Sequence, residues 1–304
     1  MPAVTWVPPE PYDLRRTLGV LRRGGGDPTC RVGADGAWWR TSRTPYGPAT
    51  VRVREDHRDG GVVVGEAWGP GAEWALQKLP GLLGAEDEPG AFVPRHRVTA
   101  EAHRRHAGLR LARTGQVMEH LIPAVLEQRV TGGSALSAWQ HLVRRYGEAA
   151  PGPAPEGMRV TPPPSVWRAI PSWEWHRAQV DPARAATVLR ACALAPRLEE
   201  AARMDLPRAT ARLRAVPGVG PWTAAETLQR ALGAPDALTL GDLHLPVQIT
   251  YALTGRRDGT DADLVALLAP YAGQRHRAAR LFLLAGPLPD RRSHRAPHTR
   301  IAGL

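Results

Sequence analysis

Residues 213–253 read LRAVPGVGPWTAAETLQRALGAPDALTLGDLHLPVQITYAL, and this stretch carries the pattern that decides the fold. A helix is predicted to end at residue 215, and a tight turn follows it, made of Val216, Pro217, Gly218, Val219 and Gly220. Two glycines in such a turn leave backbone N–H groups free at the N-terminus of the next helix, where they can bind a phosphate. An ordinary helix connection with a glycine C-cap would look the same, so the turn alone leaves both interpretations open.

An aspartate follows the turn at a second distinctive place. After a predicted helix over 222–232 and an apolar stretch over 238–240 comes Gly241-Asp242-Leu243-His244, at the point where a further helix over 243–254 is predicted to begin. Taken by itself, an aspartate at this junction is best interpreted as a helix N-cap.

Turn and aspartate together resemble the helix–hairpin–helix DNA glycosylases, which combine an L-P-G-[IV]-G hairpin with an aspartate at the start of a later helix. The lyase-type members of this family have a catalytic lysine two residues after the last hairpin glycine, and this chain has Trp222 there. Residues 216–224 are instead similar to the 3-methyladenine DNA glycosylase II branch, which has tryptophan at this position.

The resemblance extends over residues 11–286 and is weakest in the N-terminal part. Pro11-Tyr12-Asp13 is similar to the start of the branch's sheet domain, and residues 127–131 (EQRVT) resemble its helix-end Q-x-[VI]-[ST] element. In that element the residue at x, here Arg129, is the wedge that fills the gap left by a flipped base. The resemblance therefore implies that Arg129 and the neighbouring Gln128 contact the DNA. The Arg129 guanidinium could stack between bases or contact a phosphate instead.

The resemblance implies a monofunctional enzyme that flips a damaged base out of duplex DNA and hydrolyses its N-glycosidic bond. Cleavage of that bond develops positive charge on the sugar, and Asp242 is the candidate that stabilises this charge and orients water. An alkylated purine is already a cationic leaving group, and Trp222 could hold such a base against its ring. Core packing is the other interpretation of Trp222. The implied substrates are 3-methyladenine and 7-methylguanine.

The predicted base pocket departs from the branch at several positions. Glu226 stands where the branch often has tyrosine, Leu243 replaces an aromatic residue beside the aspartate, and Gln274 lies near the position of another aromatic. The pocket is therefore expected to be less aromatic and more acidic than in the family.

Further DNA contacts are predicted at two places. His244 could touch a phosphate, or be merely solvated on the first turn of its helix. Arg275 and Arg277, with His276 and Arg280, are predicted to form a basic helix face that grips the DNA backbone, or else a solvated face.

Composition points to a polyanionic partner and excludes some chemistry. Forty Lys and Arg residues against 29 Asp and Glu give a net charge of +11, which fits double-stranded DNA as the partner. The protein is expected to be a monomer. Lys78 is the only lysine, so amine chemistry has a single candidate. Cys30 and Cys192 form no CxxC motif and exclude thiolate zinc and iron–sulfur sites. No metal or other cofactor is expected, apart from a monovalent cation that the hairpin could hold.

The chain is predicted to be an α+β protein with a mostly helical glycosylase domain. Short alternating segments over 37–43, 49–54 and 61–68 predict a small antiparallel sheet, followed by a helix over 72–84. The predicted units are 1–94 (sheet and helix), 95–286 (helical, with the site between two subdomains) and a basic, disordered tail over 287–304. A loop over 147–164 is expected to be mobile. The N-terminus lacks a signal-peptide core and no apolar run is long enough to span a membrane, which predicts a cytoplasmic protein.

Three alternatives stay open at this point. A helix–hairpin–helix module can bind DNA without catalysis, a glycosylase can act on deaminated or oxidised bases, and a bifunctional enzyme can cut DNA through an imine.

Overall fold

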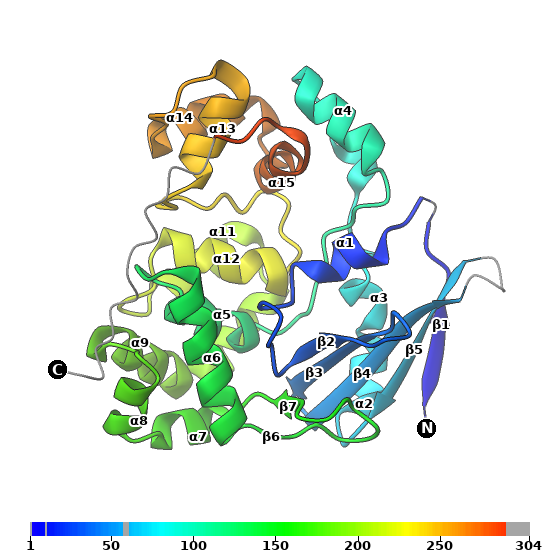
Figure 1. Cartoon of the computed structure of the whole chain (residues 1–304), viewed down its shortest axis with the longest axis vertical. Coiled ribbons are helices and arrows are strands. Elements are labelled where there is room, and N and C mark those ends of the chain that lie inside the picture. Colours follow the sequence, from blue (N-terminus) through cyan, green and yellow to red (C-terminus); the bar gives the residue numbers. More distant parts are fainter. Residues whose placement is uncertain (1, 10, 57–60, 290–304) are drawn as a thin grey trace.

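The computed structural model describes residues 2–9, 11–56 and 61–289, and most of the predicted tail over 287–304 lies outside these ranges. A five-stranded antiparallel sheet with three short helices forms one part, and helices form the rest (Figure 1). This confirms the predicted α+β class. The elements of the sheet part are β1 (Ala3–Trp6), α1 (Leu14–Gly19), β2 (Cys30–Val32), β3 (Trp38–Thr44), β4 (Gly47–Asp56), β5 (Val62–Trp68), α2 (Ala72–Gln77) and α3 (Leu79–Leu82).

The strand order in this sheet is β1-β5-β4-β3-β2, with antiparallel pairing throughout. The three central strands are those predicted from alternation, and the two short edge strands were not predicted. Along β5 buried and half-buried residues alternate, so one face is turned inward. A Cβ on Gly65 of this face would lie 2.1 Å from Leu79 Cδ2, which shows how closely α3 packs on the sheet.

The single helix predicted over 72–84 is two short helices, α2 and α3, which meet at Lys78. Pro80 in the first turn of α3 lacks the backbone N–H that a continuous helix would need. The junction leaves Lys78 exposed between the two helices.

The helical part follows the sheet in sequence. Its helices are α4 (Arg97–Arg105), α5 (Met118–Leu126), α6 (Gly132–Tyr146), α7 (Pro164–Ala169), α8 (Ser172–Arg177), α9 (Pro182–Ala193), α10 (Ala195–Glu199), α11 (Leu206–Arg214), α12 (Pro221–Ala231), α13 (Leu245–Thr254), α14 (Asp261–Leu268) and α15 (Arg275–Ala285), with short 3₁₀ turns at Pro89–Ala91, Glu200–Arg203 and Ala269–Tyr271. No helix among the described residues is long and apolar enough to cross a membrane.

The expectation of a mobile loop over 147–164 is wrong, because this segment pairs with itself and with the sheet. It contains the two-stranded ladder of β6 (Glu148–Ala149) and β7 (Arg159–Val160). Thr41 Oγ1 donates to the Arg159 carbonyl at 2.6 Å, and Arg43 Nε donates to the Thr161 carbonyl at 2.7 Å. The segment thereby joins the helical part to β3.

Buried apolar side chains gather in three large clusters that divide the fold. One joins the sheet to α1, α2 and α3, a second joins α5 to α12, and a third joins α4 to α13, α14 and α15. In Figure 1 the third group lies above the second, and the connection from α12 to α13 runs between them. Residues at this connection therefore lie where two separately packed groups of helices meet. The predicted division of the chain at residue 94 stays a prediction.

Candidate active site

The hairpin predicted from residues 216–220 forms between α11 and α12. Val219 N donates to the Val216 carbonyl at 3.0 Å and closes the turn, and the two valine side chains are 6% and 1% exposed. Gly218 has φ +96°, a backbone conformation that side chains rarely adopt, and Gly220 is the N-cap of α12. The buried valines anchor the turn while its glycines stay at the surface.

Side chains from α9 and from the turn after α5 support the hairpin through its carbonyl groups. Arg190 Nε of α9 donates to the Pro217 carbonyl at 3.1 Å, and Gln128 Nε2 donates to the Gly218 carbonyl at 2.9 Å. Within the described part of the chain, the N–H groups of Gly218 and Gly220 have no hydrogen-bond partner. These backbone N–H groups are therefore available to bind an anion, as phosphate binding at a helix N-terminus requires.

The same glutamine connects the hairpin to the predicted wedge. Its Nε2 also donates to Thr223 Oγ1 at 2.7 Å, on the first turn of α12. Arg129 follows it in the turn between α5 and α6, exposed and with φ +53°. The structure therefore brings the two predicted DNA-contacting segments side by side, although they are about ninety residues apart.

Asp242 lies in the loop that leads into α13 and is half-buried. Its Oδ2 accepts a hydrogen bond from Trp222 Nε1 at 3.0 Å, and its Oδ1 accepts from His244 N at 2.8 Å and Leu245 N at 2.7 Å. The interpretation of Asp242 as the N-cap is wrong, because α13 begins at Leu245 with His244 as its N-cap residue, and Asp242 bonds these N–H groups from the preceding loop. Three donors fix the orientation of the carboxylate, as stabilisation of a developing cation requires.

Glu226 lies one turn after Trp222 on α12, but its charge is already partnered. Its Oε2 accepts from Arg230 Nη1 at 2.8 Å, and its Oε1 accepts from Thr239 Oγ1 at 3.1 Å. The positive guanidinium of Arg230 offsets the negative charge that Glu226 was expected to bring to the pocket. The sequence contained a sign of this pair, because residues 226 and 230 have i,i+4 spacing on a helix.

The other predicted pocket residues lie near the ends of α13 and α15. Leu243 is 81% exposed beside Asp242, and His244 is exposed at the N-cap position of α13. Gln274 is the N-cap residue of α15, and its Oε1 accepts from Arg277 Nε at 2.9 Å. The roles of these residues stay predictions.

The prediction that the basic face of α15 grips DNA is wrong for Arg277. This side chain is 1% exposed and forms an ion pair with Asp87, so it cannot reach a phosphate. Arg275 is bound to Asp236 through Nε at 2.8 Å and Nη2 at 2.5 Å. Arg280 is half-buried and donates to the Arg16 carbonyl at 3.3 Å. The guanidinium groups on this face of α15 are thus bound to carboxylate and carbonyl groups of distant segments of the chain.

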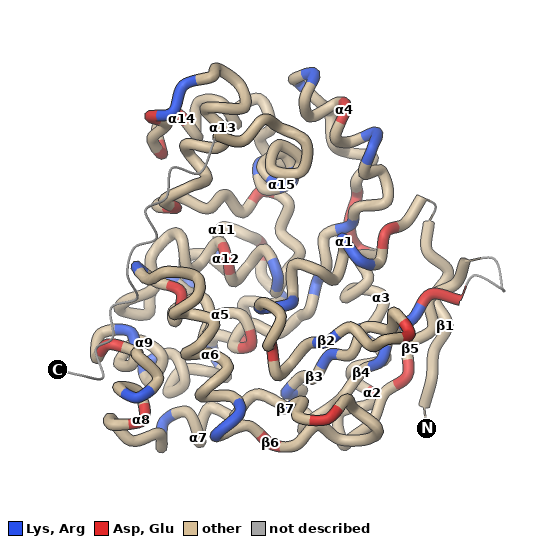
Figure 2. The backbone as a smooth tube through the Cα atoms, in the orientation of Figure 1, with Lys and Arg blue, Asp and Glu red and all other residues tan. Residues whose placement is uncertain are grey.

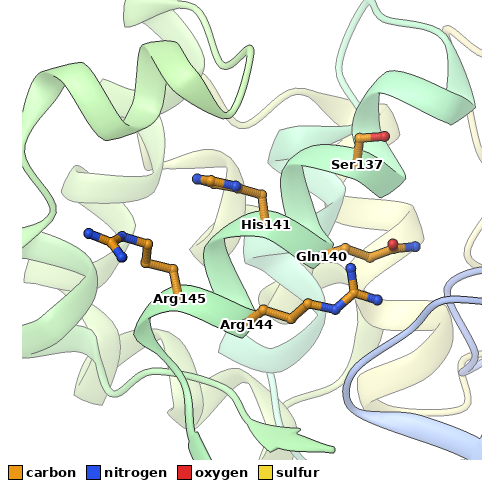
Figure 3. A pocket seen from close by; sticks show the side chains of 5 residues that line it. All are labelled: Ser137, Gln140, His141, Arg144 and Arg145. Carbon is orange, nitrogen blue, oxygen red and sulfur yellow. The ribbon is translucent and has the colours of Figure 1, made fainter. Parts of the chain in front are cut away.

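The surface carries a separate pocket of about 440 Å³ on α6. It is lined by Ser137, Gln140, His141, Arg144 and Arg145 (Figure 3). Arg144 Nη2 donates to the Gly26 carbonyl at 2.8 Å, and Arg145 Nε lies 3.4 Å from Glu174 Oε2. Its two arginines therefore bind α6 to neighbouring segments, and no residue of the hairpin or of its aspartate lines it.

Both cysteines are buried, and desolvation raises the pKa of the Cys30 and Cys192 thiols to about 12. No group of three or more histidine, cysteine, aspartate or glutamate residues within residues 2–9, 11–56 and 61–289 could hold a metal ion.

Comparison with known proteins identifies relatives of this arrangement. No protein-family model matches the chain. The chain is 32% identical over 235 residues to a probable bifunctional transcriptional activator/DNA repair enzyme AlkA of Mycobacterium tuberculosis; the match covers 72% of this chain and 44% of that protein. The chain thus spans less than half the length of this curated relative.

Two solved structures share the fold. A 3-methyladenine DNA glycosylase from Archaeoglobus fulgidus superposes with a TM-score of 0.71 at 18% identity, covering 90% of this chain and 94% of its own. An 8-oxoguanine glycosylase/lyase from Clostridium acetobutylicum superposes with a TM-score of 0.70 at 12% identity, covering 93% and 95%. At these low sequence identities, the two superpositions show that the fold is shared and show nothing further.

Proposed function

The chain belongs to the helix–hairpin–helix DNA glycosylase superfamily, and from this premise we propose that it is a monofunctional DNA glycosylase for alkylated bases. It flips such a base, of the 3-methyladenine or 7-methylguanine type, out of duplex DNA and hydrolyses its N-glycosidic bond, which starts base-excision repair. The observation that carries the proposal is the bond from Trp222 to Asp242, which joins the helix after the hairpin to the candidate carboxylate. The enzyme would act as a monomer on cytoplasmic, nucleoid DNA.

The hairpin supplies the contact with the DNA backbone. Its free N–H groups lie at the N-terminus of α12, the positive end of the helix dipole, where a phosphate would be stabilised. Lysine and arginine are spread over both parts of the molecule and alternate with acidic residues (Figure 2). With a net charge of +11, binding should weaken steeply as the salt concentration rises.

Gln128 and Arg129 are proposed to enter the duplex beside the hairpin. Extrusion of a base costs a few kcal/mol, least for a damaged base that pairs weakly. The positive φ of Arg129 turns the chain sharply at an exposed position, and the bond from its neighbour to the Gly218 carbonyl fixes this turn against the hairpin. A phosphate contact and a gap-filling contact are therefore held in a fixed relation.

Asp242 acts on the sugar by electrostatic stabilisation. As the glycosidic bond breaks, positive charge develops on the sugar, and the ionised carboxylate stabilises it and orients the attacking water. The indole N–H of Trp222 points to the carboxylate, which leaves the ring faces for a cationic base. An alkylated purine leaves as a neutral base, so no general acid is required.

We propose that the reaction needs no cofactor. A cation at the hairpin would require backbone carbonyls, and the carbonyls of Pro217 and Gly218 are hydrogen-bonded to side chains, one of them a guanidinium. Arg190 in particular would repel a cation there. The hairpin fits such an ion poorly, and no step depends on one.

Imine chemistry has no amine to use near the candidate site. Trp222 takes the position of the lysine in the lyase-type members, and the single lysine, Lys78, lies between α2 and α3 of the sheet part. Hydrolysis assisted by a carboxylate therefore accounts for the reaction without a covalent intermediate.

The test is release of bases from methylated duplex DNA by the wild-type chain and by Asp242→Asn. The variant is expected to bind DNA as the wild type does and to release no base, and full activity in the variant would overturn the role of Asp242. If the wild type binds DNA but releases no base from methylated, deaminated or oxidised duplex, the chain is a non-catalytic binding protein. A protein–DNA adduct trapped by borohydride would show a lyase instead.

A further inference from the structure

A large cavity lies between the sheet part and the helical part of the molecule, away from the proposed active site. Its volume is about 880 Å³, and α2, α3, α5, α7, α9 and α10 contribute to its wall. Neither Asp242 nor Trp222 nor any hairpin residue lines it. Protein interiors are usually packed with few voids, and cavities of this size at domain junctions are typical of sites for small molecules.

The wall of this cavity is rich in aromatic surface. Three of the ten tryptophans of the chain line it: Trp74 from α2, Trp139 from α6 and Trp167 from α7. The rings of Trp139 and Trp167 are stacked, with centroids 6.4 Å apart and planes 17° apart. Met118 and Ile122 of α5 add aliphatic surface. Trp139 and Trp167 are only 3% and 1% exposed, so the half-buried Trp74 is the one of these three tryptophans that a ligand can contact. Its ring favours a flat, aromatic ligand.

Most charged side chains around the cavity have partners. Among the described residues, the ion pairs that involve wall residues are Arg43 with Glu148, Glu86 with Arg113, Glu119 with Arg40, and Glu200 with Arg212. Lys78 and Arg203 differ, because both are exposed and neither side chain has a hydrogen bond or ion pair to any residue in 2–9, 11–56 or 61–289. The cavity therefore has two unpaired positive charges at its solvent-exposed edge.

Two buried carboxyl groups of the wall do not offset these charges. Glu119 forms an ion pair with Arg40 at 3.0 Å, and Glu199 accepts from the N–H groups of Val117 and Met118 at 2.8 and 2.9 Å. Burial raises the pKa of both carboxyl groups. Their role is to hold α5 against its neighbours, and the charge available to a ligand is positive.

We propose that this cavity binds a small aromatic anion, with a planar ring against Trp74 and the anionic group at Lys78 and Arg203. A nucleoside monophosphate has this chemistry. The site is independent of base excision, and it gives the single lysine of the chain a role that the proposed glycosylase does not need.

The experiment is isothermal titration of the full chain with three probes. Adenosine 5′-monophosphate has both ring and charge, adenosine has only the ring, and inorganic phosphate has only the charge. We expect binding of the monophosphate, with affinity at least about tenfold lower for either of the other probes, because each lacks one contact. Lys78→Met with Arg203→Met should weaken the monophosphate about tenfold, whereas Arg208→Met, at an exposed arginine of α11 outside the cavity, should leave it unchanged.

Other outcomes would overturn the proposal. It is wrong if the monophosphate does not bind, if the double variant binds it as tightly as the wild type does, or if phosphate alone binds as well. Displacement by undamaged duplex DNA would place the ligand in the DNA site instead. Asp242→Asn should bind the monophosphate unchanged, so failure of the proposed glycosylase activity and failure of this site are distinguishable.

Discussion

Trp222 donates its indole N–H to the carboxylate of Asp242 at 3.0 Å, across the connection between α12 and α13. Trp222 lies on α12, which packs with α5, and Asp242 lies in the loop that leads into α13, which packs with α14 and α15 in another hydrophobic cluster. One hydrogen bond thus fixes the orientation of the candidate carboxylate relative to the hairpin, which directly precedes Trp222.

Trp222→Phe should lower the rate of base release while DNA binding persists. The substitution keeps an aromatic ring and removes the donor, and loss of a hydrogen bond to a charged group costs about 1.5–3 kcal/mol, or at least about tenfold in rate. Single-turnover excision from methylated duplex measures the effect. Trp173→Phe, on an indole that is 66% exposed on α8, is the control and should not change the rate. An unchanged rate in Trp222→Phe would mean that the hydrogen bond has no part in catalysis.

Gln128→Ala should weaken binding to duplex DNA of any sequence by about tenfold, because two neutral hydrogen bonds of about 0.5–1.5 kcal/mol hold the hairpin against the wedge turn. Fluorescence anisotropy with unmodified duplexes of different sequence measures this loss. Gln77→Ala, at an exposed glutamine of α2, is the matched control. A loss confined to one sequence would contradict the proposed positioning role.

Gly218→Ala should destabilise the folded chain as well as impair DNA binding. The residue has φ +96°, and a Cβ there would lie 2.1 Å from Thr187 Oγ1 of α9. Strain of this kind costs about 1–3 kcal/mol, which urea denaturation would measure. Gly132→Ala, at the start of α6 where a Cβ meets nothing within 4 Å, should cause no loss of stability. Equal stability of the two variants would show that the hairpin relaxes freely.

Asp87→Asn should destabilise the fold strongly. Its partner Arg277 would keep a buried charge without a counter-ion, and breaking a buried pair in this way costs about 3–5 kcal/mol. Asp258→Asn removes one of the two carboxylate partners of the exposed Arg256 and should cost only about 0–1 kcal/mol. Denaturant midpoints of the two variants test the difference, and similar midpoints would mean that water reaches Arg277.

The stability of the fold should fall as the pH drops below about 6.5, the unfolded pKa of histidine. Burial lowers the pKa of His120 well below its usual value, so the unfolded chain binds more protons than the folded chain in this range. The stability is therefore fully present above pH about 6.5 and is lost as the pH falls toward the folded pKa. His120→Gln, which keeps a group able to bond Thr114 Oγ1, should flatten the pH dependence of the free energy of unfolding. An unchanged slope would assign the effect to other groups, of which His276 is the next candidate.

The sequence by itself determined the local features of this protein. Proline and an aspartate cap set the start of α9 at Pro182, the glycines of the hairpin allow its turn, and alternation identified the three central strands. Such signals act through dihedral angles and hydrogen bonds within a few residues, so they can be interpreted without knowledge of the fold. In the same way, α6 begins at Gly132 because Thr131 caps it, with its side chain accepting from Ser134 N.

Only the tertiary structure decided which charges and polar groups are available for function. The sequence predicted Arg277 as a DNA contact, but Asp87, 190 positions away, pairs with its guanidinium and neutralises the charge. The bond from Gln128 to the hairpin joins residues 90 positions apart. Lys78 and Arg203 likewise share a cavity only because the sheet part packs against α10 and the turn after it. The physical reason is that burial of apolar faces brings distant segments together, and the partner of each charged group then follows from packing.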